Sequence, residues 1–571
     1  MEALPEVLQR LLRARGIADA DWEKFLNPSL RDLSDPDDLP GVARAADVIL
    51  ASLDAGERIV VFGDYDCDGV CATAILVKVL TDLATGRPHV GPGRRVPTIS
   101  AFIPERLGEG YGMSDASVAR MLKENPGVGL VVTVDNGINS IRQVALLKAR
   151  GVSVVITDHH LPSRELRTDG TFGGVTLPNA EVVVDPKVLA PPHLAELCGA
   201  GVAFFLANRL VDEARRAGLY DGPKLGGPLL VLAGLATVTD IMPVLGQNRI
   251  LVAEALRNFE RCAPKGLQAL RKRAARNAHD VTSRDFGFLL GPRINAAGRM
   301  ASAMDALDLI LEEKSDDIAN EYARRIDDNN TARKTIEQDM TKAALAKVVE
   351  GAPAQVIDLP EGNPGVAGIV AARVMEQLGE TVPVCVIAGG HGSGRAPEGF
   401  NIRDAFVACR DVLANYGGHA AAGGFSVKTG LVDRFREMLV AYCEALKAKG
   451  DFVVAADETT DLWLEPADVT LGLAEALNRL EPYGEGNPEP VFGLRGVTLR
   501  DVKLLGTEGR HLSATVVAPG LANPLRAVWW GAGDRVETLR ADGDRPRDVR
   551  FTLVISDYGE RHVEISLKSA T

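Results

Sequence analysis

From about Ile59 onward, short β-rich runs alternate with helical stretches, and nearly every run ends in an acid or a histidine. The runs read RIVVFGD, TISAFIPE, GLVVTVDNG, SVVITDHH and EVVVDPK. Apolar runs of this length, separated by helical stretches, predict a parallel α/β sheet with crossover helices. Because ligands bind at the carboxyl ends of the strands in such sheets, we expect the residues that follow these runs to converge in space.

The strand ends supply acids and histidines but no thiolates. They are Asp64, Asp66, Asp68, Asp135, Asp158, His159, His160 and Asp185, with Asp240 at the end of a largely buried helix. Carboxylates as close together as those of GDYDCDG repel one another unless a cation lies between them. Oxygen and imidazole ligands suit Mn²⁺ or Mg²⁺, and more ligands are present than one ion can use. The set therefore predicts two ions about 3.5–4 Å apart, an arrangement that activates water for phosphoryl transfer.

Each of these motifs has another interpretation when it stands alone. A single DxD after a strand is common, and DHH can be a helix cap followed by two surface histidines. What favours a metal site is that all of them occur together and in order, each at a strand end.

The length of the chain, 571 residues, exceeds what one hydrophobic core holds and predicts three to four domains. Apolar residues at helical spacing between Ser315 and Glu350 predict a long amphipathic connecting helix. A glycine-rich second α/β region follows over about 352–448, and the short strands beyond Asp451 predict a small antiparallel barrel. The pattern by itself fits an oligonucleotide-binding barrel and a packing or dimerisation module equally well.

Composition narrows the class of protein further. No apolar run approaches the ~20 residues that cross a bilayer, and the N-terminus lacks the features of a signal peptide. Seven cysteines without a CxxC pair argue against a disulfide framework or a structural zinc site, so we expect a cytoplasmic protein. The net charge of −13 counts against nucleic-acid binding unless basic residues cluster. KGLQALRKRAARNA, from Lys265, is such a cluster, although a solvated helix face explains it as well.

Taken together, these motifs resemble the DHH phosphoesterase superfamily and, within it, the RecJ group of single-strand-specific exonucleases. GDYDCDG, VTVDNG, ITDHH and ATVTDIMPV are similar to the superfamily motifs. The narrower resemblance rests on IPERLGEGYG, LCGAGVAF, LGPRINAAGRM, GSGRAPEGFN, GGHAAAGGF and LEPYGEGNPEPVF. It therefore extends over nearly the whole chain.

The resemblance implies a multidomain α/β fold. A parallel-sheet DHH domain is joined by a long helix to a smaller α/β DHH-associated domain, and an oligonucleotide-binding β-barrel follows at the C-terminus. We place an N-terminal helical segment at 1–50, the DHH catalytic domain at 51–314, the connecting helix at 315–350, the DHH-associated domain at 351–448 and the barrel at 449–571.

The resemblance also implies roles for the residues at the strand ends. The implied metal ligands are Asp66, Asp68, Asp135, His159 and Asp240, with Asp135 bridging the two ions. His160 would contact the scissile phosphate or assist the leaving oxygen, and Asp64 and Asp158 would be additional catalytic acids at or behind the metals. Residues expected to pair with DNA phosphates are Arg106, Arg293, Asn295, Arg299, Arg373, Arg395 and His419. Trp529 and Trp530 are candidates for stacking on bases, or for the barrel core.

The activity implied by the resemblance is 5′→3′ degradation of single-stranded DNA to 5′-mononucleotides, in DNA repair and recombination. A single-strand-binding protein and a helicase are the implied partners, and a monomer is our expectation. Two alternatives stay open. One is a phosphoesterase for small substrates such as oligoribonucleotides, nucleotide bisphosphates or pyrophosphate, and the other is a non-catalytic replication scaffold. The barrel and the long connector favour a polymeric substrate, and the retained ligands favour an enzyme.

Two positions depart from the pattern of the relatives. Phe62 stands where many members of the superfamily have a histidine that binds one metal. Asn363 stands where the second-domain motif often has a histidine. We therefore expect a weaker metal or compensation by Asp64 at the first position, and no direct catalytic role at the second.

Overall fold

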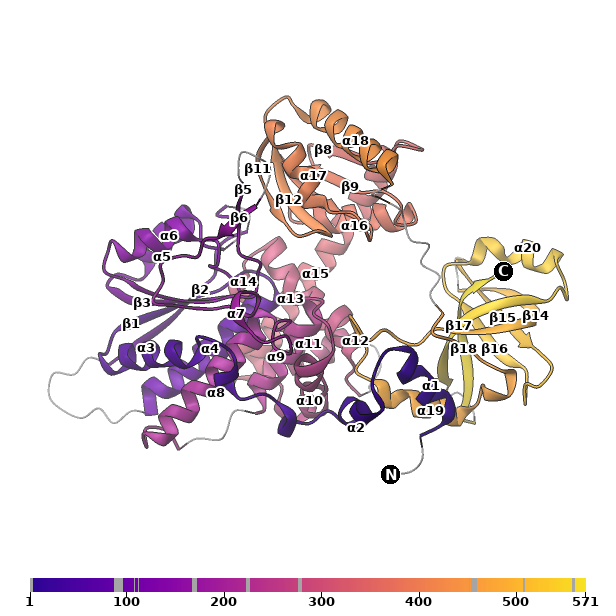
Figure 1. Cartoon of the computed structure of the whole chain (residues 1–571), viewed down its shortest axis with the longest axis horizontal. Coiled ribbons are helices and arrows are strands. Elements are labelled where there is room, and N and C mark those ends of the chain that lie inside the picture. Colours follow the sequence, from indigo (N-terminus) through magenta and orange to yellow (C-terminus); the bar gives the residue numbers. More distant parts are fainter. Residues whose placement is uncertain are drawn as a thin grey trace.

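The computed structural model describes residues 4–571 apart from 87–95, 107, 111, 167–171, 222–225, 276–279, 451, 453–459, 507–508 and 557–559. The end of the basic run that begins at Lys265 lies outside the described residues. Among the described helices, none combines the length and apolarity needed to cross a membrane. Figure 1 shows a first α/β region, a second α/β region joined to it by α15, and the C-terminal barrel.

The first sheet has five parallel strands in the order β2-β1-β3-β4-β7, which confirms the predicted parallel α/β sheet. Its strands are β1 (Arg58–Phe62), β2 (Thr98–Phe102), β3 (Val128–Val134), β4 (Ser153–Thr157) and β7 (Val182–Val184). Alternate residues of β1 enter different cores: Ile59 and Val61 lie in one, and Val60 and Phe62 in the other. The sheet is therefore buried on both faces, as a parallel sheet requires.

Helices cover both faces of this sheet. One face carries α3 (Val42–Asp54), α4 (Cys67–Gly86) and α8 (Gly199–Arg216), and the other carries α5 (Asp115–Glu124) and α6 (Ile141–Lys148). The short elements β5 (Arg164–Leu166), β6 (Phe172–Val175) and α7 (Pro186–Leu189) lie between β4 and α8 in the chain.

A helical layer extends the larger core away from the sheet. It consists of α9 (Pro228–Thr239), α10 (Gly246–Cys262), α11 (Lys265–Ala274), α12 (Ser283–Asp285), the π-helical turn η4 (Phe286–Leu290), α13 (Gly291–Met300) and α14 (Ala303–Leu311). Helix α9 is apolar on every side, which is typical of a helix buried inside a domain. This layer carries Asp240 to the edge of the sheet.

The 30-residue helix α15 (Asp316–Leu345) leads to the second α/β region. That region has a mixed five-stranded sheet in the order β11-β12-β10-β9-β8. The strands are β8 (Gln355–Leu359), β9 (Val384–Ala388), β10 (His391–Arg395), β11 (Leu413–Gly418) and β12 (Ala422–Val427), and the helices are α16 (Ala367–Gln377), α17 (Ile402–Ala408) and α18 (Val432–Lys449). Only β8 and β9 pair in parallel.

The C-terminal strands close into a barrel. They are β14 (Phe492–Leu505), β15 (His511–Val517), β16 (Leu525–Trp529), β17 (Arg547–Ser556) and β18 (His562–Ala570). Because β14 pairs with both β15 and β17, the five strands form a closed circuit, and the short β13 (Leu462–Trp463) joins β14 at the side. Helices α19 (Leu471–Leu477) and α20 (Val536–Ala541) pack against this barrel.

The N-terminal segment divides between two cores. Helices α1 (Glu6–Ala14) and α2 (Trp22–Leu26) place Leu8, Leu11 and Leu26 among the barrel residues, whereas α3 packs in the core of the first α/β region. Residues 4–26 thus complete a core whose other members lie beyond residue 460 in the sequence. Within the expected segment of 1–50, the described residues form short helices and helical turns that belong to two different cores.

Candidate metal centre

The first group of acids lies where β1 ends. Asp64 follows the strand, Asp66 lies in the turn, and Asp68 lies in the first turn of α4. Asp66 Oδ1 accepts a hydrogen bond of 3.0 Å from the backbone N–H of Gly69. A Cβ at Gly69 would lie 2.6 Å from the backbone oxygen of Asp64, so this turn requires glycine. The local fold therefore brings these three carboxylates close together at the end of β1.

A second helix holds Asp68 in place. At the N-terminus of α8, the backbone N–H groups of Gly199 and Ala200 donate to Asp68 Oδ2 and Oδ1, each at 2.7 Å. Helix N-termini favour negative charge, so α8 stabilises this carboxylate. A Cβ at Gly199 would lie 2.6 Å from the Cβ of Asp135, which makes glycine necessary there too. Sequence reasoning placed LCGAGVAF in a buried helix but missed these two roles, for which the paired glycines were the available signal.

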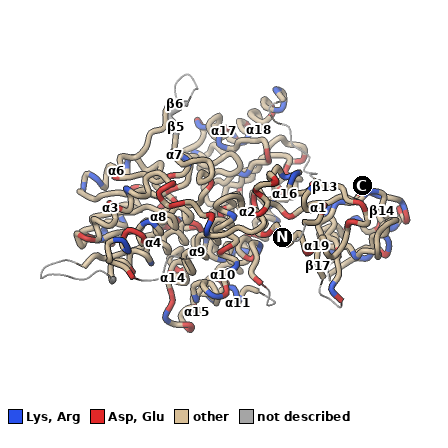
Figure 2. Tube along the Cα trace, turned by 60° about the horizontal axis from the view of Figure 1, so that its bottom comes forward, with Lys and Arg blue, Asp and Glu red and all other residues tan. Residues whose placement is uncertain are grey.

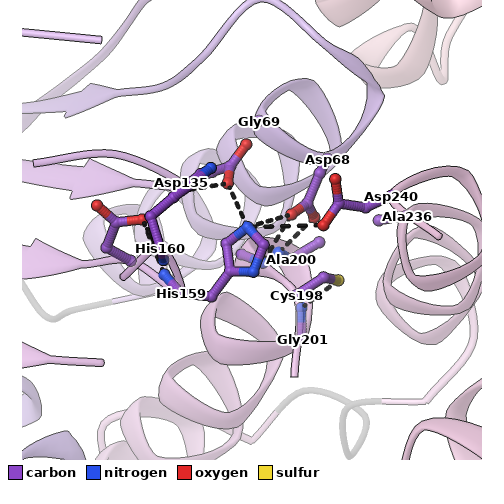
Figure 3. A network of polar contacts seen from close by, with 12 residues as sticks. Asp68, Gly69, Asp135, His159, His160, Cys198, Ala200, Gly201, Ala236 and Asp240 are labelled. Carbon is purple, nitrogen blue, oxygen red and sulfur yellow. Dashed lines mark hydrogen bonds and ion pairs between the residues drawn. The ribbon is translucent and has the colours of Figure 1, made fainter. Parts of the chain in front are cut away.

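One imidazole nitrogen faces carboxylates from three different elements, as Figure 3 shows. His159 Nε2 lies 3.0 Å from Asp135 Oδ1, 3.6 Å from Asp68 Oδ2 and 3.6 Å from Asp240 Oδ2. Asp135 directly follows β3 and has a φ of 60°, which aspartate tolerates better than most residues. Asp240 caps the C-terminus of α9. Residues far apart in the sequence thus meet around His159.

Burial and mutual repulsion disfavour negative charge throughout this group. Burial first, and then neighbouring carboxylates, raise the pKa of Asp68 to about 6 and raise the pKa values of Asp64, Asp135 and Asp240 well above their ordinary range. Burial also lowers the pKa of His159 to about 3, so its imidazole is neutral and can offer a lone pair to a cation. The donor set and its unfavourable charge together fit divalent cations.

Three overlapping triads have ligand atoms close enough to share an ion. They are Asp64, Asp66 and Asp135; Asp68, His159 and Asp240; and Asp135, His159 and His160, with all atoms of a triad within 4.8 Å of one another. Within the described part of the chain, neither side-chain oxygen of buried Asp64 has a hydrogen-bond partner at normal distance and angle, although the backbone of Tyr65 and the charges of His160 and Arg106 favour its carboxylate. Asp64 therefore fits a ligand role better than a role in support of other ligands.

Asp158 is saturated with hydrogen bonds from its own surroundings. Its Oδ1 accepts from the backbone N–H groups of His159 and His160 and lies 2.7 Å from His160 Nδ1, while its Oδ2 accepts from the N–H of Ile138. Burial disfavours the His160 imidazolium, but the bond and charge of Asp158 outweigh it and raise the pKa of His160 to about 9. Asp158 thus orients and charges His160.

The second α/β region reaches the site through His419, in the turn between β11 and β12. Its ring stacks near that of His160, with centroids 5.8 Å apart. Burial and the nearby His160 lower the pKa of His419, so the two rings form a charged and a neutral pair. The site is therefore built from both α/β regions.

Three of the expected DNA-contacting arginines lie together beside the acids. Arg106 lies over the Tyr65 ring at 4.9 Å. Arg299 donates to the backbone oxygen of Gly365, and Arg395 donates to that of Gly394. Burial and the charge of Arg106 lower the pKa of Arg395, and burial, Arg106 and Arg395 lower the pKa of Arg299 to about 9. This arginine cluster, Arg106, Arg299 and Arg395, is a half-buried concentration of positive charge.

Three other expected DNA contacts have partners in the protein. Arg293 is buried, pairs with Asp327 of α15 at 2.9 Å and donates to the backbone oxygen of Leu289. Asn295 Oδ1 accepts from the N–H of Cys67 at 2.7 Å and so fixes the loop that carries the acids. Arg373 pairs with two glutamates on α15 and α16. These partners give the three side chains a role within the protein, and their contact with DNA stays a prediction.

The two positions that depart from the relatives have structural roles here. Phe62 is buried, with its ring 5.0 Å from that of Phe102. Asn363 Oδ1 accepts from the N–H of Gly365, whose carbonyl in turn receives Arg299.

The two barrel tryptophans differ in exposure. Trp529 lies in the barrel core, whereas Trp530 is exposed and packs edge-on against His511. Figure 2 shows basic and acidic positions interspersed along the chain, so attraction for a polyanion must come from local clusters such as the arginine cluster.

Two parts of the chain match known families. Residues 58–223 match the DHH family, N-terminal domain, and residues 460–569 match the RecJ OB domain. The relatives extend the likeness. The single-stranded-DNA-specific exonuclease RecJ of Dickeya dadantii is 33% identical over 99% of this chain and 96% of its own length. That of Escherichia coli is 32% identical over 98% and 95%. The chain spans only 61% of the Bacillus subtilis relative, which is 31% identical.

Solved structures agree with these relatives. RecJ of Thermus thermophilus in complex with Mn²⁺ matches with a TM-score of 0.79 and 30% identity, over 100% of this chain and 78% of that one. The complex of the same protein with Mg²⁺ matches with a TM-score of 0.72 and 29% identity, over 100% and 77%.

Proposed function

Since this chain belongs to the RecJ family of single-stranded-DNA-specific exonucleases, we propose that it removes nucleotides one at a time from the 5′ end of single-stranded DNA, using two divalent cations. The observation that carries this proposal is the convergence of carboxylates on His159 beside the arginine cluster. The products would be 5′-mononucleotides, and DNA repair and recombination in the cytoplasm would be the setting.

We assign the metal ligands from the triads. Asp64, Asp66 and Asp135 would hold one ion, and Asp68, His159 and Asp240 the other, with Asp135 between them. The assignment of Asp64 as a ligand extends the expected set and makes up for Phe62. Bound cations would supply an activated water and neutralise charge on the reacting phosphate. Mn²⁺ and Mg²⁺ both fit an oxygen-rich site that includes histidine.

His160 would act on the phosphate that is cleaved. As an imidazolium oriented by Asp158, it can hold a non-bridging phosphate oxygen or give a proton to the departing oxygen. His419, from the other side, would contact the same phosphate. The chain thus contributes a positioned positive charge and a proton, in addition to the metal ligands.

The arginine cluster offers a physical basis for polarity. The charge of Arg106 lowers the pKa values of both Arg299 and Arg395, so the three guanidinium groups concentrate positive charge beside the acids. A terminal phosphate carries more negative charge than an internal one and would relieve this repulsion best. Gly368 leaves space for the guanidinium of Arg395, because a Cβ there would lie 2.8 Å from Arg395 Nη2. We therefore propose that the cluster binds the 5′-phosphate of the strand.

The test is a digestion of single-stranded DNA labelled at its 5′ or its 3′ end, with Mn²⁺ and with duplex DNA in parallel. We expect immediate release of the 5′ label as mononucleotide from single strands only. Asp135→Asn should abolish release. Asp501→Asn is the matched control, because Asp501 is an exposed barrel aspartate that also has a positive φ. Immediate release of the 3′ label would overturn the proposed polarity.

A second comparison tests the arginine cluster directly. Substrates with a 5′-phosphate and with a 5′-hydroxyl are digested by the wild type, by Arg106→Ala and by Arg434→Ala, which alters an exposed arginine of α18. The wild type and the control should prefer the phosphate, and Arg106→Ala should lose that preference. If Arg106→Ala keeps the preference for a 5′-phosphate, the arginine cluster does not bind that phosphate.

The proposed partners are single-stranded DNA, a single-strand-binding protein and a helicase. We propose a monomer as the active state, and the described residues assign no docking surface to either protein partner.

A further inference from the structure

Two exposed apolar side chains flank the metal centre on the side of Asp240. Ile241 follows Asp240 directly, and 71% of its surface is exposed. Phe288 lies in η4, and 77% of its surface is exposed. These are among the most exposed large hydrophobic residues in the described chain, and neither belongs to a core cluster.

The segments that carry these side chains pack against each other. A Cβ at Gly287 would lie 3.4 Å from Val238 Cγ1, and one at Gly291 would lie 2.2 Å from Thr239 Cγ2. Val238 and Thr239 form the last turn of α9, which ends at Asp240. The η4 turn is therefore held against the end of the helix that delivers a metal ligand.

Both side chains depend on unusual backbone conformations. Ile241 has a φ of 57°, which is strained for a β-branched residue. Phe288 belongs to a π-helical turn, a conformation that is rare and frequent at functional sites. Neither conformation brings the side chain into a core, so the fold gains no burial in return for the strain.

The positively charged side chain of Arg284 lies beside the aromatic ring of Phe288. The Arg284 guanidinium lies 5.7 Å from the centroid of the Phe288 ring. Arg284 is also close enough to Glu489, just before the barrel strand β14, for its positive charge to favour the Glu489 carboxylate. Figure 1 shows α12, which contains Arg284, on the side of the catalytic region that faces the barrel. This apolar ledge, Ile241 and Phe288 with Arg284 beside it, thus lies between the metal centre and the barrel.

We propose that the apolar ledge binds the unpaired bases of the DNA strand, with Phe288 stacked on a base and Arg284 paired with a neighbouring phosphate. The inference rests on the proposed function and names residues that select single strands. Aromatic rings stack on any base, whereas bases inside a duplex are already stacked and paired. Ile241 would contact the base nearest Asp240.

The test compares Phe288→Ala, Phe288→Trp and Val349→Ala, an exposed apolar control just beyond the C-terminal end of α15. With single-stranded DNA and Mn²⁺, Phe288→Ala should raise KM about fivefold to about hundredfold, the range that stacking on one base implies, and leave kcat close to wild type. Phe288→Trp should restore KM, and Val349→Ala should match the wild type. Thermal unfolding should be unchanged in all three, because each substituted side chain is exposed.

Abasic sites placed singly along the strand identify the base that is bound. For the wild type, one such site should raise KM, and Phe288→Ala should be insensitive to it. If Phe288→Ala has the KM of the wild type, or if both respond equally to every abasic site, the ledge does not bind bases. A wild type that leaves single-stranded DNA intact would instead contradict the proposed function, so the two failures are distinguishable.

Discussion

Asp158 illustrates how an acid at a strand end can support a proposed metal site by orienting a neighbour. Its oxygens accept hydrogen bonds from backbone N–H groups, and Oδ1 lies 2.7 Å from His160 Nδ1, so the protein already engages both of them. Asp64 is the opposite case, since it is buried with little hydrogen bonding of its own. Spacing along the sequence does not separate the two roles, but the hydrogen bonds do.

Asp158→Asn should change the pH dependence of the exonuclease. Without the negative charge, the pKa of His160 falls from about 9 toward its ordinary value, so the imidazolium is lost as the pH rises through a lower range. At pH 8 we expect kcat to fall about 100-fold, the scale of a lost acid catalyst, with partial recovery as the pH is lowered. The measurement is kcat between pH 6 and 9.5. Asp501→Asn, an exposed aspartate of the barrel, is the control, and a profile shared by all three proteins would contradict the role of Asp158.

Asp135→Asn should have opposite effects on stability with and without metal. The folded-state pKa of Asp135 is raised, so without metal its contribution to stability is present only at low pH and is lost as the pH rises above the ordinary carboxyl range. At pH 7.5 in EDTA the variant should therefore unfold at a higher temperature than the wild type. Mn²⁺ at about 100 times its Kd should stabilise the wild type by about 2.7 kcal/mol and the variant by much less. Thermal unfolding with EDTA and with Mn²⁺ measures both effects, and an EDTA-treated variant less stable than the wild type would contradict this account.

Among the elements, α10 joins the catalytic region to the barrel. Its Arg249 is 2% exposed and donates to the backbone oxygens of Phe25, Leu480, Glu481 and Pro482. Burial lowers the pKa of Arg249 to about 10, so the residue is still charged at neutral pH. One guanidinium thus satisfies carbonyls from the N-terminal segment and from the chain that enters the barrel.

Arg249→Met should loosen the barrel from the catalytic region. Several buried carbonyls lose their donor, which we expect to cost about 3 kcal/mol. All four tryptophans, at 22, 463, 529 and 530, lie in the barrel or in the helix packed on it, so fluorescence reports this part of the molecule alone. In urea, the fluorescence transition of the variant should move to lower concentration than its far-ultraviolet circular dichroism transition. Arg257→Met, on the same helix but half-exposed, should shift neither by much. If the two transitions of Arg249→Met coincide, Arg249 does not hold the barrel to the catalytic region.

At the scale of the whole molecule, the N-terminal helix packs in the core of the C-terminal barrel. Leu11 of α1 is fully buried among barrel residues, whereas Leu53 of α3 is buried in the catalytic core. Leu11 and most of α3 lie in the segment 1–50 that the sequence analysis treated as one unit. The fold therefore closes on itself, and the barrel depends on residues at the opposite end of the sequence.

Leu11→Ala and Leu53→Ala should destabilise different parts of the molecule. Each removes buried atoms and should cost about 2–5 kcal/mol. Limited proteolysis should cut Leu11→Ala within 460–571 and Leu53→Ala within the catalytic region, whereas Arg10→Ala, on the exposed face of α1, should resemble the wild type. Cleavage of Leu11→Ala confined to the first residues would contradict the shared core.

The sequence by itself determined the parallel sheet, the barrel and the chemistry of the strand ends, because these follow from local periodicity and from the rule that parallel strands end at one edge. The tertiary structure alone decided which partner each polar group meets. In the folded chain, the N-terminus of α8 donates hydrogen bonds to Asp68. Arg293 pairs with Asp327, Asn295 accepts from the N–H of Cys67, and α1 packs in the barrel core. The physical reason is that the hydrogen-bond partners of a side chain depend on which distant elements pack beside it. No local sequence pattern encodes that packing.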